Sequence, residues 1–384
     1  MKRIVLAFLA VCLLLSGCQW PDGRYHRMTP HQQPSAEDES QVEVAENYLQ
    51  LRTALENMVS AGVENSVISV SDFRQDQLSD SIAMAVRHVK NTYPLGAYAV
   101  EEISYEVGTI GGTSAVAVEI TYLHGRNELR RIHQVENMEQ AEELIAAALT
   151  DFDTKLVLLI DAYQAADIGQ WVEDYASDNP SVVMETPEIS LQIYPETGHQ
   201  RVLELKFKYQ SSRDSLRVMR DLVQRVFDSA ALYVSHDAGD ARKLSQLYAF
   251  LMERFDSYQL KTSLTPAYSL LNHGVGDSAA FAEVYAEMCE KAGMECMVVV
   301  GTRSGEPWCW NIVLDDGYYY HVDLLACQTQ GGFRSCTDSQ MADYVWDYSA
   351  YPACTGRPVE EVPEETTVPS GETESAEETV TPEK

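Results

Sequence analysis

The sequence predicts an α+β protein in which a duplicated small α/β module precedes a larger domain at the C-terminal side. Between about residues 42 and 232, a strand, a helix, a turn with proline and a strand hairpin occur twice, with a period of about 90 residues. From Leu270 to Asp323, a helix with one apolar face is followed by three strands. Helices and strands in such runs are typical of α+β folds.

The N-terminus has the pattern of an export signal. Lys2 and Arg3 are basic, residues 4–15 are apolar, and the sequence LSGC ends at Cys18. An apolar run of about 12 residues is too short to span a bilayer. LSGC resembles a bacterial lipobox, which implies removal of residues 1–17 and lipidation of Cys18. We therefore expect an extracytoplasmic protein that meets the membrane only through this lipid anchor; an ordinary secretory signal is the alternative.

The charge of the chain restricts its partners. The formal net charge is −31, and it becomes −33 when Lys2 and Arg3 leave with the signal. A field of this sign repels nucleic acid and anionic lipid headgroups, so we expect no nucleic-acid partner. Residues 18–41 are predicted to be a flexible tether. Residues 357–384 contain nine Glu among Pro, Thr and Ser and are predicted to be a disordered acidic tail.

The duplicated region covers residues 42–232, with units of about 42–135 and 136–232. VISVSDFRQ and LVLLIDAYQ occupy equivalent places, and the hairpins end in SAVAVEITY and RVLELKFKY. The GTIGGT sequence at residues 108–113 is interpreted as a hairpin turn, because no helix follows it to form a phosphate-binding loop. This region predicts architecture and no chemistry.

The helix near the C-terminal side is defined by its ends and its apolar face. Asp277 or Ser278 offers an N-cap, and Gly293 is placed to end the helix. Strands are predicted at residues 297–300, 310–314 and 318–322, with Asp315-Asp316-Gly317 as a hairpin turn. Apolar side chains recur at helical spacing at Phe281, Val284, Tyr285, Met288 and Ala292.

Several segments resemble the transglutaminase-like superfamily, which has a papain-like fold. They are NHGVGDSAAFAEVYAEMCEKAGMEC, GTRSGEPWCWNIV and GYYYHVD, with residues 244–255 and 265–268 upstream. The resemblance implies a papain-like transglutaminase core over residues 233–356. In that family a Cys opens the helix, a His lies two residues before the Trp-Asn pair, and an Asp ends the third strand. Those positions are Ser278, Trp308 and Asp323 here, so two of the three catalytic residues are replaced.

These replacements predict loss of catalysis. A Ser hydroxyl without a base is a poor nucleophile, and the indole N–H of Trp308 is a donor only. We expect a catalytically inactive domain without cofactor that binds an extended peptide or a cell-envelope protein. Trp308 is expected to fill the cleft, or to contact a ligand there together with Trp310 and His321. Asp323 is expected to stabilise the fold by pairing with an indole, a backbone N–H or His321.

One alternative keeps enzymatic activity. His321 lies two residues before Asp323 on a strand and therefore on the same face, so a hydrolase or acyl transferase that uses Ser278 with His321 as base stays open. His273 lies just ahead of Ser278 as well. Cys309 alternates with the two tryptophans and is expected to point away from the cleft.

The cysteines fit an exported protein. Cys12 leaves with the signal and Cys18 carries lipid. An even number remains, so disulfides are expected, although the pairing stays open and free buried thiols are an alternative. A metal site is not expected, because there is no CxxC pair and His is sparse. The remaining cysteines are Cys289, Cys296, Cys309, Cys327, Cys336 and Cys354.

Overall fold

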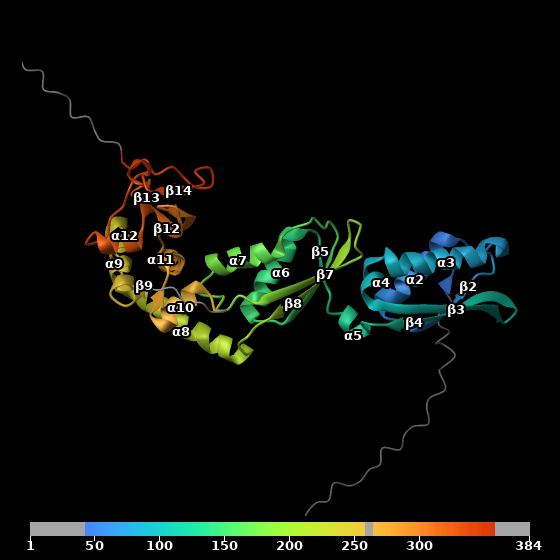
Figure 1. Ribbon diagram of the computed structural model, residues 1–384. Helices are drawn as coiled ribbons and strands as arrows, with labels where there is room; N and C mark the ends of the chain where they lie inside the picture. The colour runs from blue at the N-terminus through green and yellow to red at the C-terminus, as the bar shows by residue number, and fades with distance from the viewer. Residues whose placement is uncertain (1–42, 258–263, 358–384) are drawn as a thin grey trace, which may run out of the picture. The chain divides into compact units, whose positions relative to one another are not determined.

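A computed structural model describes residues 43–257 and 264–357 (Figure 1). The predicted signal, the predicted lipidated Cys18, the tether up to residue 42 and the acidic tail from residue 358 lie outside the described residues. Within the described part, no helix is long and apolar enough to cross a membrane. The chain divides into two units, Met1–Arg130 and Arg131–Lys384.

The first unit holds one α/β module. Its sheet has the order β1-β2-β4-β3, in which β1 and β2 are parallel and the other pairs are antiparallel. Leu51 and Ile82 of the helices are buried against Ile68 and Val116 of the sheet. The elements are β1 (Glu43–Val44), α2 (Tyr48–Ala61), β2 (Asn65–Ser69), α3 (Gln75–Asn91), α4 (Pro94–Ala99), β3 (Val100–Ile110), β4 (Thr113–Tyr122) and α5 (Arg126–Leu129).

The second unit begins with a module of the same topology. Its sheet has the order β5-β6-β8-β7, again with one parallel pair followed by two antiparallel pairs. Corresponding strands begin about 90 residues apart, in agreement with the period in the sequence. The elements are β5 (His133–Val135), α6 (Met138–Asp151), β6 (Lys155–Ile160), α7 (Ile168–Asp178), β7 (Glu188–Tyr194) and β8 (Arg201–Lys208).

The first long helix of each module is capped in the same way. Asn47 accepts a hydrogen bond from the Gln50 N–H at 3.1 Å, and Asn137 accepts one from the Gln140 N–H at 3.0 Å. Each glutamine side chain returns to accept from the backbone N–H of the residue before its asparagine. The repeated sequence Glu-Asn-x-x-Gln is therefore the local signal that starts α2 and α6.

The rest of the second unit is an α+β arrangement built on the sheet β13-β12-β11-β14. All neighbouring strands in this sheet are antiparallel. The elements are α8 (Arg213–Tyr233), α9 (Asp240–Met252), β9 (Asp256–Ser257), α10 (Pro266–His273), β10 (Val275–Gly276), α11 (Ser278–Lys291), β11 (Cys296–Arg303), β12 (Glu306–Asp315), β13 (Tyr318–Val322), α12 (Leu324–Thr329), a 3₁₀-helix (Asp338–Gln340) and β14 (Tyr344–Trp346).

The turns of this sheet were only partly predicted. The turn after β12 is confirmed, since Asp316 and Gly317 have φ of 49° and 83°. β11 and β12 are longer than expected, because Ser304 and Gly305, with φ of 53° and 86°, join them in a tight hairpin. A Ser-Gly pair is a turn signal, and the sequence interpretation missed it here.

The second module and the C-terminal part share one core. Phe152 and Met184 of the module lie in the same hydrophobic cluster as Phe227 of α8 and Phe281 of α11. The Thr265 N–H donates to the Met184 carbonyl at 3.1 Å. The boundary expected between residues 232 and 233 lies inside α8, which packs against both parts.

Candidate functional site

The site is built around the start of α11. Asp277 caps this helix, since its Oδ1 accepts from the Ala280 N–H at 3.1 Å, which confirms one of the two predicted caps. Gly276 allows close packing here, because an added Cβ would lie 2.7 Å from the Ala280 Cβ. Ser278 is the first helical residue, and its Oγ accepts from the Cys309 N–H of β12 at 3.2 Å. The fold thus binds this hydroxyl to the neighbouring strand.

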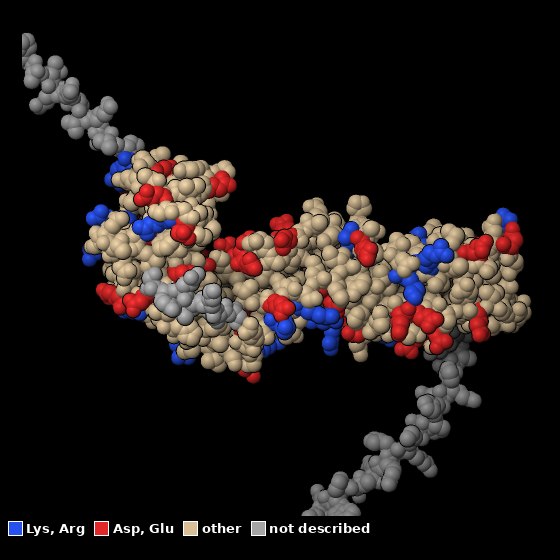
Figure 2. Space-filling model, in the orientation of Figure 1, with Lys and Arg blue, Asp and Glu red and all other residues tan. Residues whose placement is uncertain are grey.

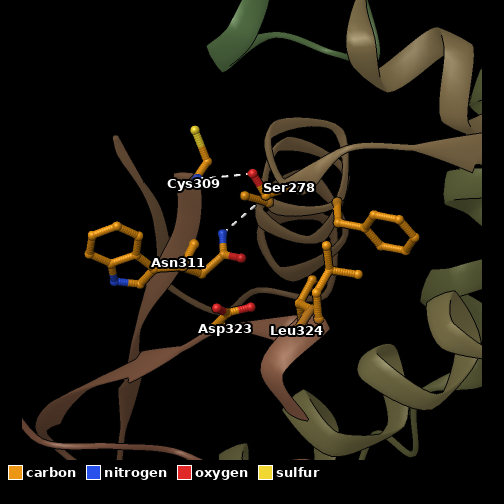
Figure 3. A pocket seen from close by; sticks show the side chains of 9 residues that line it. Ser278, Cys309, Asn311, Asp323 and Leu324 are labelled. Atoms are coloured by element: carbon orange, nitrogen blue, oxygen red, sulfur yellow. Dashed lines mark hydrogen bonds between the residues drawn. The ribbon is translucent and has the colours of Figure 1, made fainter. Parts of the chain in front are cut away.

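A narrow crevice lies between the start of α11 and β12. Nine residues line it, and they include Ser278, Cys309, Asn311 and Asp323 (Figure 3). It has no room for a water-sized sphere, and Trp308 is not among the lining residues. The crevice is therefore closed to a substrate in this conformation.

The prediction that Cys309 points away from the cleft is wrong. The face of β12 that meets α11 carries Cys309 and Asn311, whose Nδ2 donates to the Ala282 carbonyl at 2.9 Å. Side chains alternate between the two faces of a strand, so the sequence correctly placed Cys309 on the face opposite Trp308 and Trp310. It could not tell which of the two faces α11 covers. Burial raises the pKa of the Cys309 thiol to about 11, and the carboxyl groups of Glu283 and Asp277 add to the effect. Cys309 is therefore a neutral thiol at physiological pH and a poor nucleophile.

Trp308 is bound to Asp323. Its Nε1 donates to Oδ2 of Asp323 at 2.9 Å, and the Arg303 guanidinium donates to the same oxygen at 3.2 Å. The Tyr344 hydroxyl donates to it as well, at 2.6 Å. Burial raises the pKa of Tyr344 well above its usual value, with a further contribution from Asp323, so the phenol keeps its proton. The other carboxylate oxygen accepts from the Ala326 N–H at 2.9 Å and caps α12.

Four hydrogen bonds therefore hold the Asp323 carboxylate. The expected pairing with an indole and a backbone N–H is confirmed, whereas Arg303 and Tyr344 were missed. Arg303 also lies over two rings, at 5.3 Å from the Trp308 centroid and 5.5 Å from the Tyr344 centroid. The guanidinium, indole and phenol thus surround the carboxylate that orients a catalytic His in the family that this segment resembles.

His321 does not face Ser278. It pairs with Ile312 across the β12–β13 ladder and therefore lies on the face opposite Asn311. Its Nδ1 accepts from the Trp310 Nε1–H at 3.0 Å, and its Nε2 lies 2.9 Å from Oδ1 of Asp338. Burial lowers the pKa of this imidazole, and the hydrogen bond to Asp338 opposes the shift. Both ring nitrogens are engaged, so His321 is not placed to act as base for Ser278.

Trp310 and His321 belong to a buried aromatic cluster. Each is 1% exposed, and the Trp346 ring contacts both, with centroids at 5.7 Å and 4.8 Å. Tyr344 packs on Trp310 from another side. Both rings are enclosed by this cluster, and Trp310 also lines the crevice beside Ser278. Ligand contact by Trp308, Trp310 and His321 was one of two alternatives from the sequence and stays a prediction.

One group of side chains has the composition of a metal site. Ligand atoms of His321, Asp338 and Cys354 lie within 4.8 Å of one another. The Trp310 N–H points at Nδ1 of His321, which places the imidazole proton on Nε2, toward Asp338. Burial raises the pKa of the Cys354 thiol to about 12. Hydrogen bonds connect the three residues, since the Cys354 N–H donates to Oδ2 of Asp338 at 3.0 Å.

Glu283 is a functional candidate that the sequence interpretation missed. It is 5% exposed on α11, and its Oε1 accepts from the Ser177 hydroxyl of α7 at 2.9 Å. Burial raises its pKa to about 8, the carboxyl groups of Asp277 and Asp178 raise it further, and the Ser177 and Ala267 hydrogen bonds oppose the shift. The Glu283 carboxyl group, which lies between α7 of the second module and α11, therefore tends to keep its proton near neutral pH. Its signal was a lone Glu inside the apolar run AAFAEVY.

Comparison with known proteins covers part of the chain. Residues 229–326 match the transglutaminase-like superfamily, and no curated protein matches. The solved structures include a TGase at 10% identity and TM-score 0.25, covering 57% of this chain and 63% of that one. A candidate cysteine protease from Cytophaga hutchinsonii has 10% identity and TM-score 0.25, covering 41% of this chain and 70% of that one.

A candidate protease from Parabacteroides distasonis has 9% identity and TM-score 0.22, covering 66% of this chain and 39% of that one. This chain thus spans less than two thirds of the first and third of these structures. The protein is an α+β chain that carries a transglutaminase-like domain over residues 229–326, near its C-terminal side.

Proposed function

We propose that this chain is a surface-anchored lipoprotein whose transglutaminase-like domain does not catalyse a reaction and instead binds an extended peptide or an envelope protein. The observation that carries the proposal is the saturation of Asp323. Its carboxylate receives hydrogen bonds from Trp308, Arg303 and Tyr344, and a backbone N–H takes the remaining oxygen. A carboxylate held in this way stabilises the fold and has no imidazole to orient.

The groups around Ser278 support the same conclusion. Its hydroxyl accepts from the Cys309 N–H, and the nine described residues that line the crevice include no histidine. A Ser hydroxyl is activated by an adjacent base, and His321 lies on the far face of the sheet.

An exposed part of the sheet supports peptide binding. Val300 of β11 and Val345 of β14 are 66% and 65% exposed. Val300 pairs with Cys309 and therefore lies on the face of the sheet that α11 covers. Val345 pairs with Thr302, which is two residues after Val300 on β11, so Val345 lies on the same face. β14 is one of the two edge strands of this sheet in the described part of the chain. An exposed edge beside apolar side chains is where an extended peptide adds as a further strand.

The charge of the chain supports the choice of partner. In Figure 2, acidic and basic side chains are scattered over the visible face, and no broad basic surface is seen there among the described residues. With a net charge of −31, the chain is poorly suited to nucleic acid. The proposed membrane contact is the lipid on Cys18 alone, which rests on the LSGC sequence.

A peptide-display selection against the full chain tests the binding part of the proposal. We expect enriched peptides whose affinity falls at least tenfold in Val345→Lys, because the substitution places a charge beside the edge strand. Val218→Lys is the matched control, since Val218 is 59% exposed on α8. Peptides that bind Val345→Lys and wild type equally would contradict this location.

Palmitate labelling in a bacterial host tests the anchor. We expect the wild-type chain to carry label and to partition with membranes, and the Cys18→Ala chain to lose both properties, because two acyl chains are enough for stable anchoring. Label that persists in Cys18→Ala would contradict lipidation at this residue.

A further inference from the structure

The outer edge of β11 is only half paired. β14 pairs with residues 301–303 of this strand and ends at Trp346. A turn follows, in which the Ala350 N–H donates to the Asp347 carbonyl at 3.1 Å. Within the described part of the chain, residues 296–300 therefore have β12 on one side and no strand on the other.

The hydrogen bonds of the backbone show which groups point to this open edge. The Leu314 N–H at the end of β12 donates to the Glu295 carbonyl at 3.1 Å, so Glu295 is directed to β12. Successive residues of a strand direct their backbone groups to opposite sides, so Val298 and Val300 are directed to the open edge. In agreement, the Val300 N–H donates to the Tyr351 hydroxyl at 3.3 Å. Among the described residues, none is hydrogen-bonded to the N–H or the carbonyl of Val298 on this side.

The surroundings of the open edge suit an added strand. The Tyr351 hydroxyl accepts from the Val300 N–H, as the carbonyl of a neighbouring strand would. Val300 is 66% exposed on the face that α11 covers, and Tyr348 is 64% exposed, with its ring centroid 4.2 Å from that of Trp346. Residues 296–300 contain no charged side chain and no proline, which are the residues that commonly prevent an edge from pairing.

The direction of β14 determines which peptide fits. A strand that continues the line of β14 runs antiparallel to β11, so its first residue lies opposite Val300 and its fifth opposite Cys296. Its sixth side chain then lies beside Glu295, which is exposed, so a cation is favoured there. The acidic tail of the chain is a poor occupant, because residues 357–384 contain nine Glu and four Pro.

We propose that the unpaired half of β11 binds an extended peptide of five apolar or β-branched residues followed by Lys or Arg, which adds to the sheet in line with β14. The N–H and the carbonyl of Val298 bond to the third residue of the peptide. The carbonyl of its first residue takes the Val300 N–H from the Tyr351 hydroxyl. This inference rests on the proposed function and names the strand and the backbone groups that hold the peptide.

Hydrogen exchange of the full-length chain tests the inference, read at single valines by NMR of ¹⁵N-valine-labelled protein. The probe is the peptide acetyl-Val-Thr-Val-Thr-Val-Lys-amide, whose third residue is expected opposite Val298. In the free chain, the Val298 amide should exchange much faster than the Val299 amide, which is directed to β12. Probe at about 2 mM should slow exchange at Val298 by roughly threefold for a dissociation constant of about 1 mM, and leave Val299 unchanged.

Two N-methylated probes are the controls. Methylation of the third residue removes the N–H that bonds to the Val298 carbonyl and should abolish the effect. Methylation of the second residue, whose N–H points to solvent, should keep it.

Three results would overturn the inference. In the first, the probe leaves exchange at Val298 unchanged. In the second, Val298 in the free chain is protected increasingly with protein concentration, because a second copy then covers the edge. In the third, Val298 is protected in the free chain and loses this protection when residues 358–384 are deleted, because the tail then covers the edge.

Failure of this inference can be told apart from failure of the proposed function. Peptides from the display selection that bind the chain without slowing exchange at Val298 would overturn the location and keep the proposed function. A selection that enriches no peptide would contradict the proposed function and, with it, this inference.

Discussion

Replacing Glu283 by Gln should change how stability depends on pH. Glu283 is buried between α7 and α11, and its pKa in the folded protein is raised from 4.5 to about 8. The folded protein therefore keeps a proton on this group at pH values where the unfolded chain has lost it. Glu283→Gln retains the shape and a hydrogen-bonding oxygen but cannot ionise.

The raised pKa of Glu283 sets the direction and the size of the change in stability with pH. Because the folded-state pKa is raised, the stability that protonated Glu283 contributes is fully present below about pH 4.5 and is lost as the pH rises through about 8. Each pKa unit corresponds to about 1.4 kcal/mol. Between pH 5 and pH 8, the wild-type chain should therefore lose about 3 to 4 kcal/mol relative to Glu283→Gln.

Urea denaturation of both full-length chains at pH 5 and pH 8 measures this difference. Glu290→Gln is the matched control, because Glu290 is exposed on the same helix, and its effect should stay within about 0.5 kcal/mol at both pH values. A Glu283→Gln difference that is the same at pH 5 and pH 8 would refute the assignment of a raised pKa to this residue.

Two further changes test the packing of the site. Asp323→Ala should lower the free energy of unfolding by about 3 kcal/mol, because the Arg303 and Tyr344 donors lose their acceptor. Peptide binding should stay unchanged. An unshifted melting temperature together with lost binding would instead show that Asp323 belongs to a functional site. Gly276→Ala should lower the free energy of unfolding, measured by urea denaturation, by about 1 to 3 kcal/mol, since the added Cβ would lie 2.7 Å from the Ala280 Cβ. Gly108→Ala is the control and should be nearly neutral, because its added Cβ meets nothing within 4 Å. Equal effects of the two substitutions would argue against close packing at the start of α11.

Local patterns predicted local structure. Asp277, Gly293 and the turn at Asp316 and Gly317 act within a few residues of the elements that they start or end, so each was recognisable in the sequence. The duplication was also recognisable, because equivalent segments recur at one period. Its sharpest signal, the Glu-Asn-x-x-Gln cap of α2 and α6, was overlooked.

Contacts across the sheet were not recognisable. Alternation along β12 shows that Cys309 and Trp310 face opposite sides, but only packing decides which side α11 covers. Arg303 and Tyr344 lie 20 and 21 residues from Asp323 in the sequence. The pairing of β11, β12 and β14, together with the end of β13, brings both side chains to the Asp323 carboxylate. Glu283 is buried by α7, which belongs to the second module, and no pattern within α11 contains that information.

We propose that the transglutaminase-like domain has lost its chemistry at Ser278. The most direct measurement is the rate of ammonia release from glutamine peptides, with and without an amine acceptor, for the full-length wild-type chain and for Ser278→Ala. We expect both rates to equal the background without protein. Turnover by the wild-type chain that disappears in Ser278→Ala would contradict it.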